Sequence, residues 1–584
     1  MSRWTKKEPV IQPAPAHAQV TPVTTLDARP RLGDVLVAEN KLLPEQLAGA
    51  LNLQVESGRQ LGSILVEQGL LDPAALTEAL ATQFGLPTVD LRAVRPTAEA
   101  LAVVTEDVAR RFRIVPMQLT DDGDLDVAIA DGSSAAVREA LGRLEVREVN
   151  VFLASPDDVA TSLNTYYRVL SDSDENVQQF WKTDAAKQEI AAVINATDEA
   201  PIIQLVNKIV TQALRDRASD IHIEPTDGRI RVRYRIDGAL REVLSLPEST
   251  GPELVSRIKI MAQMDIVERR RPQDGQFEAT VDGAGVDVRV ATGATIFGET
   301  AVLRLLDKSR SVKNLSELGM PASTYERYLS IVTKPYGMMV CSGPTGSGKT
   351  TTLYATLAAI TRSELNVMTI EDPVEYVFPA VNQMQINLRA DVTFASGLKS
   401  ILRQDPDVIL IGEIRDEETA RIAVQSALTG HVVMSSLHAT DATSVFYRLI
   451  DMGIEPFLIA SSLVGVVGQR LVRKICPSCV VPYDPTPLEL ETYRYLGGPP
   501  KELFVRGIGC NYCSQMGYRD RMGVYEVLTV TDEIRQLVMS RATPQEMRSL
   551  AVSQGMRTMS NEAMALVAAD ATTIDEVIHN VYVS

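Results

Sequence analysis

The sequence is poor in several residue types and has no long uninterrupted apolar run. It contains only five cysteines, five histidines and two tryptophans. Its most apolar stretch, residues 457–472, is broken by Ser461, Gly465 and Arg470, so we expect no membrane-spanning helix. Residues 1–28 lack the apolar core of a secretory signal. Acidic residues outnumber basic ones, 75 to 58, for a formal net charge of −17, which argues against general nucleic-acid binding.

The remaining composition is that of a multidomain globular protein. Of the 584 residues, 45% are apolar and 23% are charged, which excludes a disordered or collagen-like chain. Strand and helix patterns alternate from residue 316 onward, which predicts a parallel α/β sheet with helical crossovers. We predict these segments: a disordered tail at 1–28, a helical repeat at 29–91, a small α/β part at 92–170, a linker at 171–195, a middle domain at 196–315 and an α/β domain at 316–584.

The first folded region contains an internal repeat. The pattern Leu32-Gly33-x-x-Leu36-Val37 recurs 29 positions later as Leu61-Gly62-x-x-Leu65-Val66. Asn40 occupies the place of Gly69, and both residue types tolerate a positive φ. We therefore expect the same tight turn in both halves of the repeat.

Residues 343–350, Gly-Pro-Thr-Gly-Ser-Gly-Lys-Thr, fit the phosphate-binding pattern G-x-x-x-x-G-K-[ST]. A buried-strand pattern precedes them and a helix pattern follows. Glycines let backbone N–H groups converge on a phosphate, and the helix N-terminus adds positive potential. Lys349 is predicted to reach the β- and γ-phosphates, and Thr350 to bind Mg²⁺. An ordinary glycine-rich turn is the alternative, and the motifs that follow argue against it.

Two acidic groups follow apolar strands further along the chain. Glu413 comes after the strand pattern at 407–411, and the cluster from Glu371 to Glu375 follows the one at 367–370. Ligands of open α/β sheets lie at the carboxyl ends of the strands, so both groups are expected beside the phosphate loop. A surface acidic turn is the alternative for the second group. His431 and His438 flank the next apolar strand, where a purely structural role is the alternative to a functional one.

These residues together resemble the type II/IV secretion ATPases, which include the assembly ATPases of type IV pili. Residues 343–350, 369–375, 402–416 and 429–440 match the Walker A, Asp box, Walker B and His box of that family in order and spacing. The resemblance implies a RecA-like P-loop ATPase core, a PAS-like α+β middle domain and a mixed N-terminal domain. It also implies a hexamer in which the middle domain of one subunit closes on the nucleotide of the ATPase core.

The resemblance further implies ATP and Mg²⁺ as ligands and assigns roles to residues. Arg289 and Arg304 would contact phosphate, and their positions within apolar strands support this, with a structural salt bridge as the alternative. Glu375 would orient or deprotonate the attacking water, and Glu413 would act on the metal side. The implied nucleotide-binding residues are Gly343, Pro344, Thr345, Gly346, Ser347, Gly348, Lys349, Thr350, Thr351, Arg403, Arg415, His431 and His438.

Four of the five cysteines form two Cys-x-x-Cys pairs, Cys476/Cys479 and Cys510/Cys513. Four thiolates at this spacing suit a closed structural Zn²⁺ site, in an insert around 471–520. Two reducible disulfides are the alternative. In the family that the sequence resembles, this insert marks assembly and secretion ATPases. The fifth cysteine, Cys341, is expected in the core.

The repeat is similar to the tandem 24-residue motifs, joined by a 5-residue spacer, that bind cyclic di-GMP in some family members. Asn40 and Lys41 depart from the pattern in the first half. A helical docking module without a ligand is the alternative. The resemblance implies ligand contacts from Arg31, Leu32, Gly33, Asp34, Gln54, Leu61 and Gly62.

We therefore expect a cytoplasmic homohexamer, peripheral at the inner face of the cytoplasmic membrane, that hydrolyses ATP to power type IV pilus assembly. It would engage an inner-membrane platform protein and bind no nucleic acid stably. The alternatives are a type II secretion pseudopilus ATPase, a DNA-uptake or conjugation motor, and a scaffold that binds nucleotide without turnover.

Overall fold

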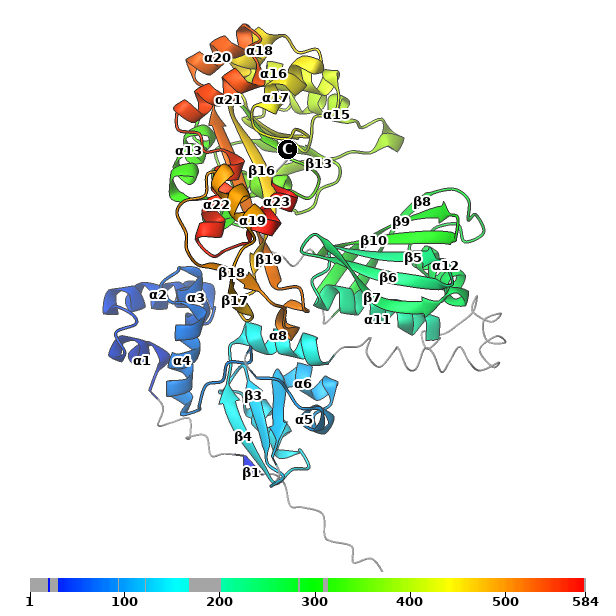
Figure 1. Cartoon of the computed structure of the whole chain (residues 1–584), viewed down its shortest axis with the longest axis vertical. Coiled ribbons are helices and arrows are strands. Elements are labelled where there is room, and N and C mark those ends of the chain that lie inside the picture. The colour runs from blue at the N-terminus through cyan, green and yellow to red at the C-terminus, as the bar shows by residue number, and fades with distance from the viewer. Residues whose placement is uncertain are drawn as a thin grey trace, which may run out of the picture. The chain divides into compact units, whose positions relative to one another are not determined.

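The computed structural model describes residues 19–20, 30–92, 94–120, 122–167, 201–281, 284–307 and 313–581. The chain divides into two compact units, Met1–Asp172 and Ser173–Ser584 (Figure 1). The predicted linker lies outside the described residues, as does the predicted tail apart from residues 19–20. Among the helices of the described residues, none combines the length and apolar character needed to cross a bilayer.

The repeat folds as two helix pairs in the first unit: α1 (Leu32–Ala38) with α2 (Pro44–Ser57), and α3 (Leu61–Glu67) with α4 (Pro73–Phe84). The predicted turn is confirmed, because Asn40 has a φ of 56° and Gly69 a φ of 67°. A Cβ on Gly33 would lie 2.8 Å from the Leu47 side chain, and one on Gly62 would lie 3.1 Å from Leu76. The repeated glycines therefore let the two helices of each pair approach closely.

The rest of the first unit is a sheet with the order β1-β4-β3-β2, flanked by helices. The segment predicted as a small α/β part, 92–170, contains β2, β3 and β4 of this sheet. The elements are β1 (Gln19–Val20), α5 (Ala98–Val103), α6 (Glu106–Phe112), β2 (Ile114–Leu119), β3 (Leu125–Ile129), α7 (Ala135–Gly142), β4 (Glu148–Leu153) and α8 (Pro156–Tyr166).

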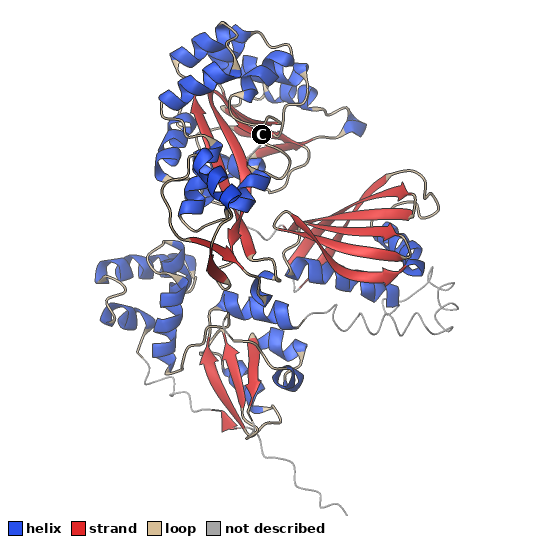
Figure 2. Cartoon of the chain, viewed as in Figure 1, coloured by secondary structure: helices blue, strands red, loops and turns tan. Residues whose placement is uncertain are grey.

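The second unit begins with a six-stranded antiparallel sheet of order β7-β6-β5-β10-β9-β8, against which α11 and α12 pack (Figures 1 and 2). Tyr234 ties the sheet to α11, because its hydroxyl donates to the Ile209 carbonyl over 2.6 Å. The elements are α11 (Pro201–Arg215), β5 (Asp220–Thr226), β6 (Arg229–Ile236), β7 (Ala239–Pro247), η3 (Glu248–Thr250), α12 (Gly251–Met261), β8 (Gln273–Val281), β9 (Ala284–Thr295) and β10 (Gly298–Asp307).

The predicted parallel α/β domain is confirmed as a seven-stranded sheet of order β13-β12-β14-β15-β11-β16-β19, in which only the pairing of β16 with β19 is antiparallel. Helices cover both faces (Figure 2). Its strands are β11 (Gly337–Ser342), β12 (Val367–Glu371), β13 (Asn382–Gln385), β14 (Val408–Ile411), β15 (Val432–Leu437), β16 (Leu463–Ile475) and β19 (Tyr518–Thr529). Its helices are η4 (Leu315–Leu318), α13 (Ala322–Val332), α14 (Lys349–Ile360), η5 (Leu388–Ala390), α15 (Phe394–Ile401), α16 (Glu417–Leu428), α17 (Ser444–Asp451), α18 (Pro456–Ser462), α20 (Asp532–Met539), α21 (Pro544–Ser553), α22 (Met559–Ala568) and α23 (Ile574–Asn580).

An excursion between β16 and β19 carries the four paired cysteines. It contains β17 (Val480–Tyr483), α19 (Pro487–Tyr495), β18 (Phe504–Gly507) and η6 (Asn511–Cys513), with β17 and β18 paired antiparallel. Its far end meets β7 of the six-stranded sheet, since the Arg241 guanidinium donates to the Ser514 carbonyl. The excursion therefore contacts the six-stranded sheet as well as the parallel one.

Candidate nucleotide and metal sites

The phosphate loop joins the buried strand β11 to the first residue of α14, Lys349. Gly343, Gly346 and Gly348 all have a positive φ, and a Cβ on Gly343 would lie 2.5 Å from the Gln469 carbonyl oxygen, so that position requires glycine. Lys349 is buried, and its Nζ donates to the carbonyls of Gly343 and Pro344 over 2.9 and 3.0 Å. Burial lowers the pKa of Lys349, and the nearby charge of Glu413 partly offsets this.

A pocket of about 1100 Å³ opens at this edge of the sheet, within the size range of small-molecule sites. It brings together most of the predicted site residues. Those that line it are Pro344, Thr345, Gly346, Ser347, Gly348, Lys349, Thr350, Thr351, Arg304, Glu375, Glu413, Arg415 and His438. Sequence reasoning singled out no role for three others that line it, Tyr354, Asp220 and Arg470. Arg470 alone had a local signal, as a charge inside the apolar strand β16.

The structure does not bring His431 or Arg403 to this pocket. His431 precedes β15 and its carbonyl accepts from the Gly337 amide over 3.0 Å, at the beginning of the parallel strand β11. A strand of six residues spans roughly 20 Å, so residues flanking it on either side cannot both reach the same edge. His438 lies at the phosphate edge and His431 at the other, where its Nδ1 lies 2.9 Å from the Ser426 carbonyl oxygen. Arg403 is exposed and likewise precedes its parallel strand, β14.

Glu413 follows β14 and lies beside basic side chains. Arg415 Nη2 lies 2.5 Å from its Oε1, and His438 Nε2 lies 3.4 Å from its Oε2. Burial alone would raise the pKa of Glu413, but the Arg415 hydrogen bond and the charges of Arg415, His438 and Lys349 outweigh it and hold that pKa below the usual range. Glu413 is therefore an ionised carboxylate at neutral pH.

Glu375 lies on the loop after β12, and its surroundings act in the opposite direction. The Glu375 residue is still exposed to solvent at the open side of the pocket. The surrounding protein atoms partly desolvate its carboxyl group, and the negative charge of Glu371 adds to the effect, so the pKa of Glu375 lies above its usual range. Arg289 and Arg304 partly offset the rise. Glu375 can therefore accept a proton more readily than Glu413.

The arginines come from one row across the six-stranded sheet. Register places Arg235, Asp220, Arg304 and Arg289 side by side on β6, β5, β10 and β9. Arg304 Nε lies 2.9 Å from Asp220 Oδ1, so the salt bridge that was the alternative interpretation is present. The Arg304 side chain is nevertheless 62% exposed and lines the pocket, so the salt bridge orients a guanidinium that still faces the phosphate loop. Arg289 stands beside Arg304 without lining the pocket of this chain.

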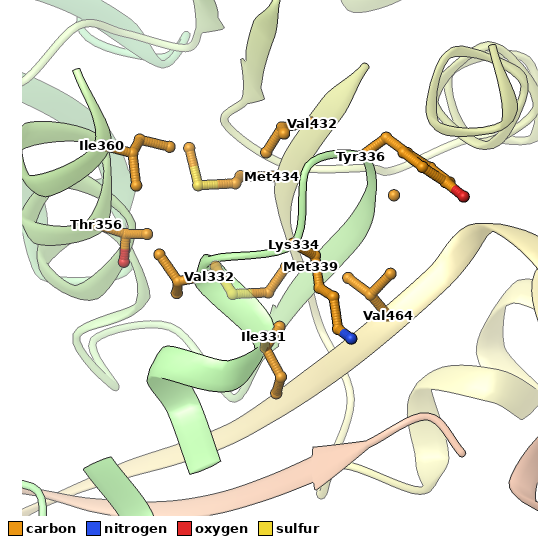
Figure 3. Close-up of a pocket in the computed structure, with 11 residues that line it drawn as sticks. Ile331, Val332, Lys334, Tyr336, Met339, Thr356, Ile360, Val432, Met434 and Val464 are labelled. Carbon is orange, nitrogen blue, oxygen red and sulfur yellow. The ribbon is translucent and has the colours of Figure 1, made fainter. Parts of the chain in front are cut away.

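A smaller pocket lies at the opposite edge of the parallel sheet (Figure 3). Tyr336 and Gly337 at the start of β11 and Val432 at the start of β15 line it. Its walls are mainly aliphatic and Lys334 is the only charged residue among them. This pocket therefore does not suit a triphosphate.

The four paired cysteines converge as predicted. Their sulfur atoms all lie within 4.8 Å of one another. Cys476 and Cys510 Sγ are 3.9 Å apart, and Cys479 and Cys513 Sγ are 3.8 Å apart. Two sulfurs bound tetrahedrally to one Zn²⁺ would be about 3.8 Å apart, so this donor set fits that ion. The amides of Cys510 and Gly517 each donate to Cys513 Sγ over 3.2 Å, which favours a thiolate there.

Strand order and phosphate loop together define the class of the protein. One strand, β15, separates the phosphate-loop strand β11 from the carboxylate strand β14, and the next strand, β12, carries Glu375 beyond its end. This is the arrangement of RecA-like P-loop ATPases.

Comparison with known proteins identifies the family. The profile of the type II/IV secretion system proteins matches residues 195–579, and the chain belongs to this family. The profile of the MshEN domain matches residues 84–172, which follow the repeat motifs. The protein is thus an ATP hydrolase of the secretion and pilus-assembly superfamily.

Two relatives match the chain over almost its whole length. It is 38% identical over 560 residues to the type IV pilus assembly ATPase PilB of Myxococcus xanthus, which covers 94% of this chain and 98% of the relative. It is 39% identical over 562 residues to the type II secretion system protein E of Xanthomonas campestris pv. campestris, with the same coverage of both chains. A third, the type II secretion system protein HxcR of Pseudomonas aeruginosa, is 47% identical over 390 residues, or 67% of this chain and 79% of the relative.

Proposed function

We propose that the protein is a homohexameric motor that hydrolyses ATP to extend a type IV pilus, acting at the inner face of the cytoplasmic membrane through a platform protein. The observation that carries the motor assignment is the single pocket shared by the phosphate loop, two differently tuned carboxylates and Arg304 of the middle domain. A pocket walled by two domains can convert nucleotide turnover into domain movement. The full-length likeness to a pilus assembly ATPase supports the choice of pilus.

A type II secretion ATPase is the second candidate, supported by the equally complete match to a secretion protein E. Deleting the gene in its host separates the two candidates. Loss of surface pili with unchanged exoprotein secretion supports the pilus motor, whereas the reverse supports the secretion motor. Addition of DNA to the purified protein should leave its hydrolysis rate unchanged, since the chain carries a net charge of −17.

In the proposed reaction, water attacks the γ-phosphorus in line, the bond between that phosphorus and the bridging β–γ oxygen breaks so that ADP leaves, and Glu375 takes the proton of the water. Lys349 and Arg304 stabilise the charge that develops on the phosphate oxygens. Thr350 and Glu413 would hold Mg²⁺, which neutralises charge on the phosphates when bound. Light scattering of the purified chain with and without ATP and Mg²⁺ tests the hexamer, and a persistent monomer under both conditions contradicts it.

We propose that the four-cysteine cluster holds one structural Zn²⁺, because its sulfur spacing fits tetrahedral coordination. Metal analysis should find one zinc per chain. Cys513→Ser should lower that ratio and the melting temperature. Cys341→Ala is the matched control, since Cys341 is a buried cysteine in the core of the parallel domain and should leave the zinc content unchanged. Equal zinc content in both variants contradicts the site.

We also propose that the tandem repeat binds cyclic di-GMP, through Arg31 at the start of α1 and the closely packed Leu-Gly segments of α1 and α3. The departure at Lys41 has a structural reason, because its Nζ pairs with Glu78 of the second half over 2.9 Å. Calorimetric titration of the full chain with cyclic di-GMP should give saturable heat that Arg31→Ala abolishes. Arg143→Ala, which removes an exposed arginine from the same unit, is the control. No heat with the folded chain contradicts the proposal.

A further inference from the structure

A buried tyrosine lies between the phosphate-loop helix and the loop that carries Glu375. Tyr354 is on α14, whose first residue is Lys349, and only 2% of its surface is exposed. Its ring packs edge-on against Tyr376 and Phe378, with ring centroids 5.8 and 5.3 Å away. Both of these aromatic residues belong to the chain that continues from Glu375, so the ring fixes one side of that loop.

The hydroxyl of Tyr354 makes two hydrogen bonds that join separate elements. It donates to Glu371 Oε2 at the end of β12, and it accepts the backbone N–H of Glu375 over 3.2 Å. Burial, and then the charge of Glu371, raise the pKa of Tyr354, so the hydroxyl keeps the proton that it donates. Its oxygen remains free to accept from Glu375.

The anchor of this chain of hydrogen bonds, Glu371, is itself tightly held. It is 3% exposed, and its Oε1 accepts from Thr369 Oγ1 over 2.5 Å and from Gln383 Nε2 over 3.2 Å. Neutral donors from β12, β13 and α14 thus hold a buried carboxylate in one orientation. A buried polar group satisfied in this way is costly to move.

We propose that Tyr354 is a positioning residue that holds the backbone of Glu375 at a fixed place relative to the phosphate loop. Lys349 and Tyr354 lie on one rigid helix, so the hydroxyl transmits the position of the phosphates to the loop that carries the proposed base. The inference rests on the proposed role of Glu375 in hydrolysis. A misplacement of about 1 Å at such a site costs on the order of 10²-fold in rate.

The test is Tyr354→Phe in the full-length chain, which keeps the ring contacts and removes only the hydroxyl. The chain offers a matched control in Tyr328→Phe. Tyr328 is fully buried, and its hydroxyl is hydrogen-bonded to Thr356 of α14, the helix that also carries Tyr354. The core residues around Tyr328 do not include Glu375. Both variants therefore lose one buried hydroxyl that contacts α14.

We expect Tyr354→Phe to lower kcat on the order of 10- to 100-fold while the Kd for ATP changes less than about 2-fold. Tyr328→Phe should lose a similar amount of thermal stability and keep kcat within about 2-fold of the unmodified chain. If both variants lose stability and only Tyr354→Phe loses kcat, the effect of Tyr354 is one of positioning and not of packing. Equal kcat in the two variants overturns the proposal.

Combining Tyr354→Phe with Glu375→Gln asks whether the hydroxyl acts through Glu375. Once the base is gone its position no longer matters, so the double variant should be within about 2-fold of Glu375→Gln alone. If the kcat losses of the two single variants multiply in the double variant, Tyr354 acts elsewhere and the proposal is overturned. If Glu375→Gln impairs turnover and Tyr354→Phe does not, only this inference fails. Normal turnover in Glu375→Gln overturns the proposed function of Glu375 and this inference with it.

Discussion

Two loops at the same edge of the parallel sheet each carry a glutamate, and the pKa values of these two glutamates are shifted in opposite directions. Partial desolvation in the pocket and the nearby charge of Glu371 raise the pKa of Glu375 after β12, whereas Arg415 and His438 lower the pKa of Glu413 after β14. Because β12 and β14 are hydrogen-bonded neighbours, position on the sheet does not explain the difference. The charged groups beside each carboxyl group do, with Glu371 beside Glu375, and Arg415 and His438 beside Glu413. A raised pKa suits proton transfer, and a carboxylate that is ionised at neutral pH suits a cation.

The strongest way to break this comparison is to neutralise each carboxylate in turn. Glu375→Gln should lower kcat by about 10²–10⁴-fold and leave nucleotide affinity nearly unchanged, the usual range for a positioned general base. Glu413→Gln should cost less turnover at saturating Mg²⁺ and should raise the Mg²⁺ concentration needed for half-maximal rate. Phosphate-release assays across a magnesium series measure both. Identical losses with identical magnesium dependence would show that the two loops are not specialised.

Removing an arginine from the pocket should give the next largest effect. Arg304→Gln should lower kcat by about 10²–10³-fold, the range seen when one preorganised donor to a developing charge is lost. Because Arg304 lowers the pKa of Glu375, the acid limb of the kcat profile should also move to higher pH.

The control for this prediction is Arg229→Gln, which removes a half-exposed arginine paired with Glu242 elsewhere on the same sheet. It should leave both kcat and the position of the acid limb unchanged. A loss in Arg304→Gln without a change in the pH profile would place the Arg304 charge too far from Glu375 to influence it.

Local signals predicted the phosphate loop, its flanking strand and helix, and the cysteine cluster, because each depends on residues close in sequence. The Tyr354–Glu371 bond depends on how α14 packs against the sheet, and the Arg304–Asp220 pair depends on which strands are neighbours. No short motif encodes either arrangement. The same limit explains why His431 does not lie in the pocket with His438. Its spacing from His438 suggested a shared site, but the strand between them carries the two histidines to opposite edges.

A smaller effect should follow from removing the partner that keeps Glu413 ionised. Arg415→Gln removes the hydrogen bond and charge that lower the pKa of Glu413, so this pKa should rise. Glu413 would then protonate at higher pH, and activity should decline earlier on the acid side while neutral-pH turnover changes only a few-fold. Initial rates measured across a pH series at fixed Mg²⁺ test this. An acid limb that does not move would mean that the limb is set by Glu375 alone.

The smallest predicted effect is on stability, and there the two carboxylates should differ in sign. The folded-state pKa of Glu375 is raised, so its protonated form is favoured by the fold and its ionised form destabilises the protein at neutral pH. The folded-state pKa of Glu413 is lowered, so its charge contributes stability at neutral pH that is lost as the pH falls through that value. Glu375→Gln should therefore raise the melting temperature at neutral pH and Glu413→Gln should lower it, each by about 2–4 °C per kcal/mol of changed stability. In acid, where both carboxylates are protonated and resemble glutamine, both differences should shrink. Shifts of the same sign in calorimetric scans would contradict the opposite tuning of the two loops, whatever the kinetics show.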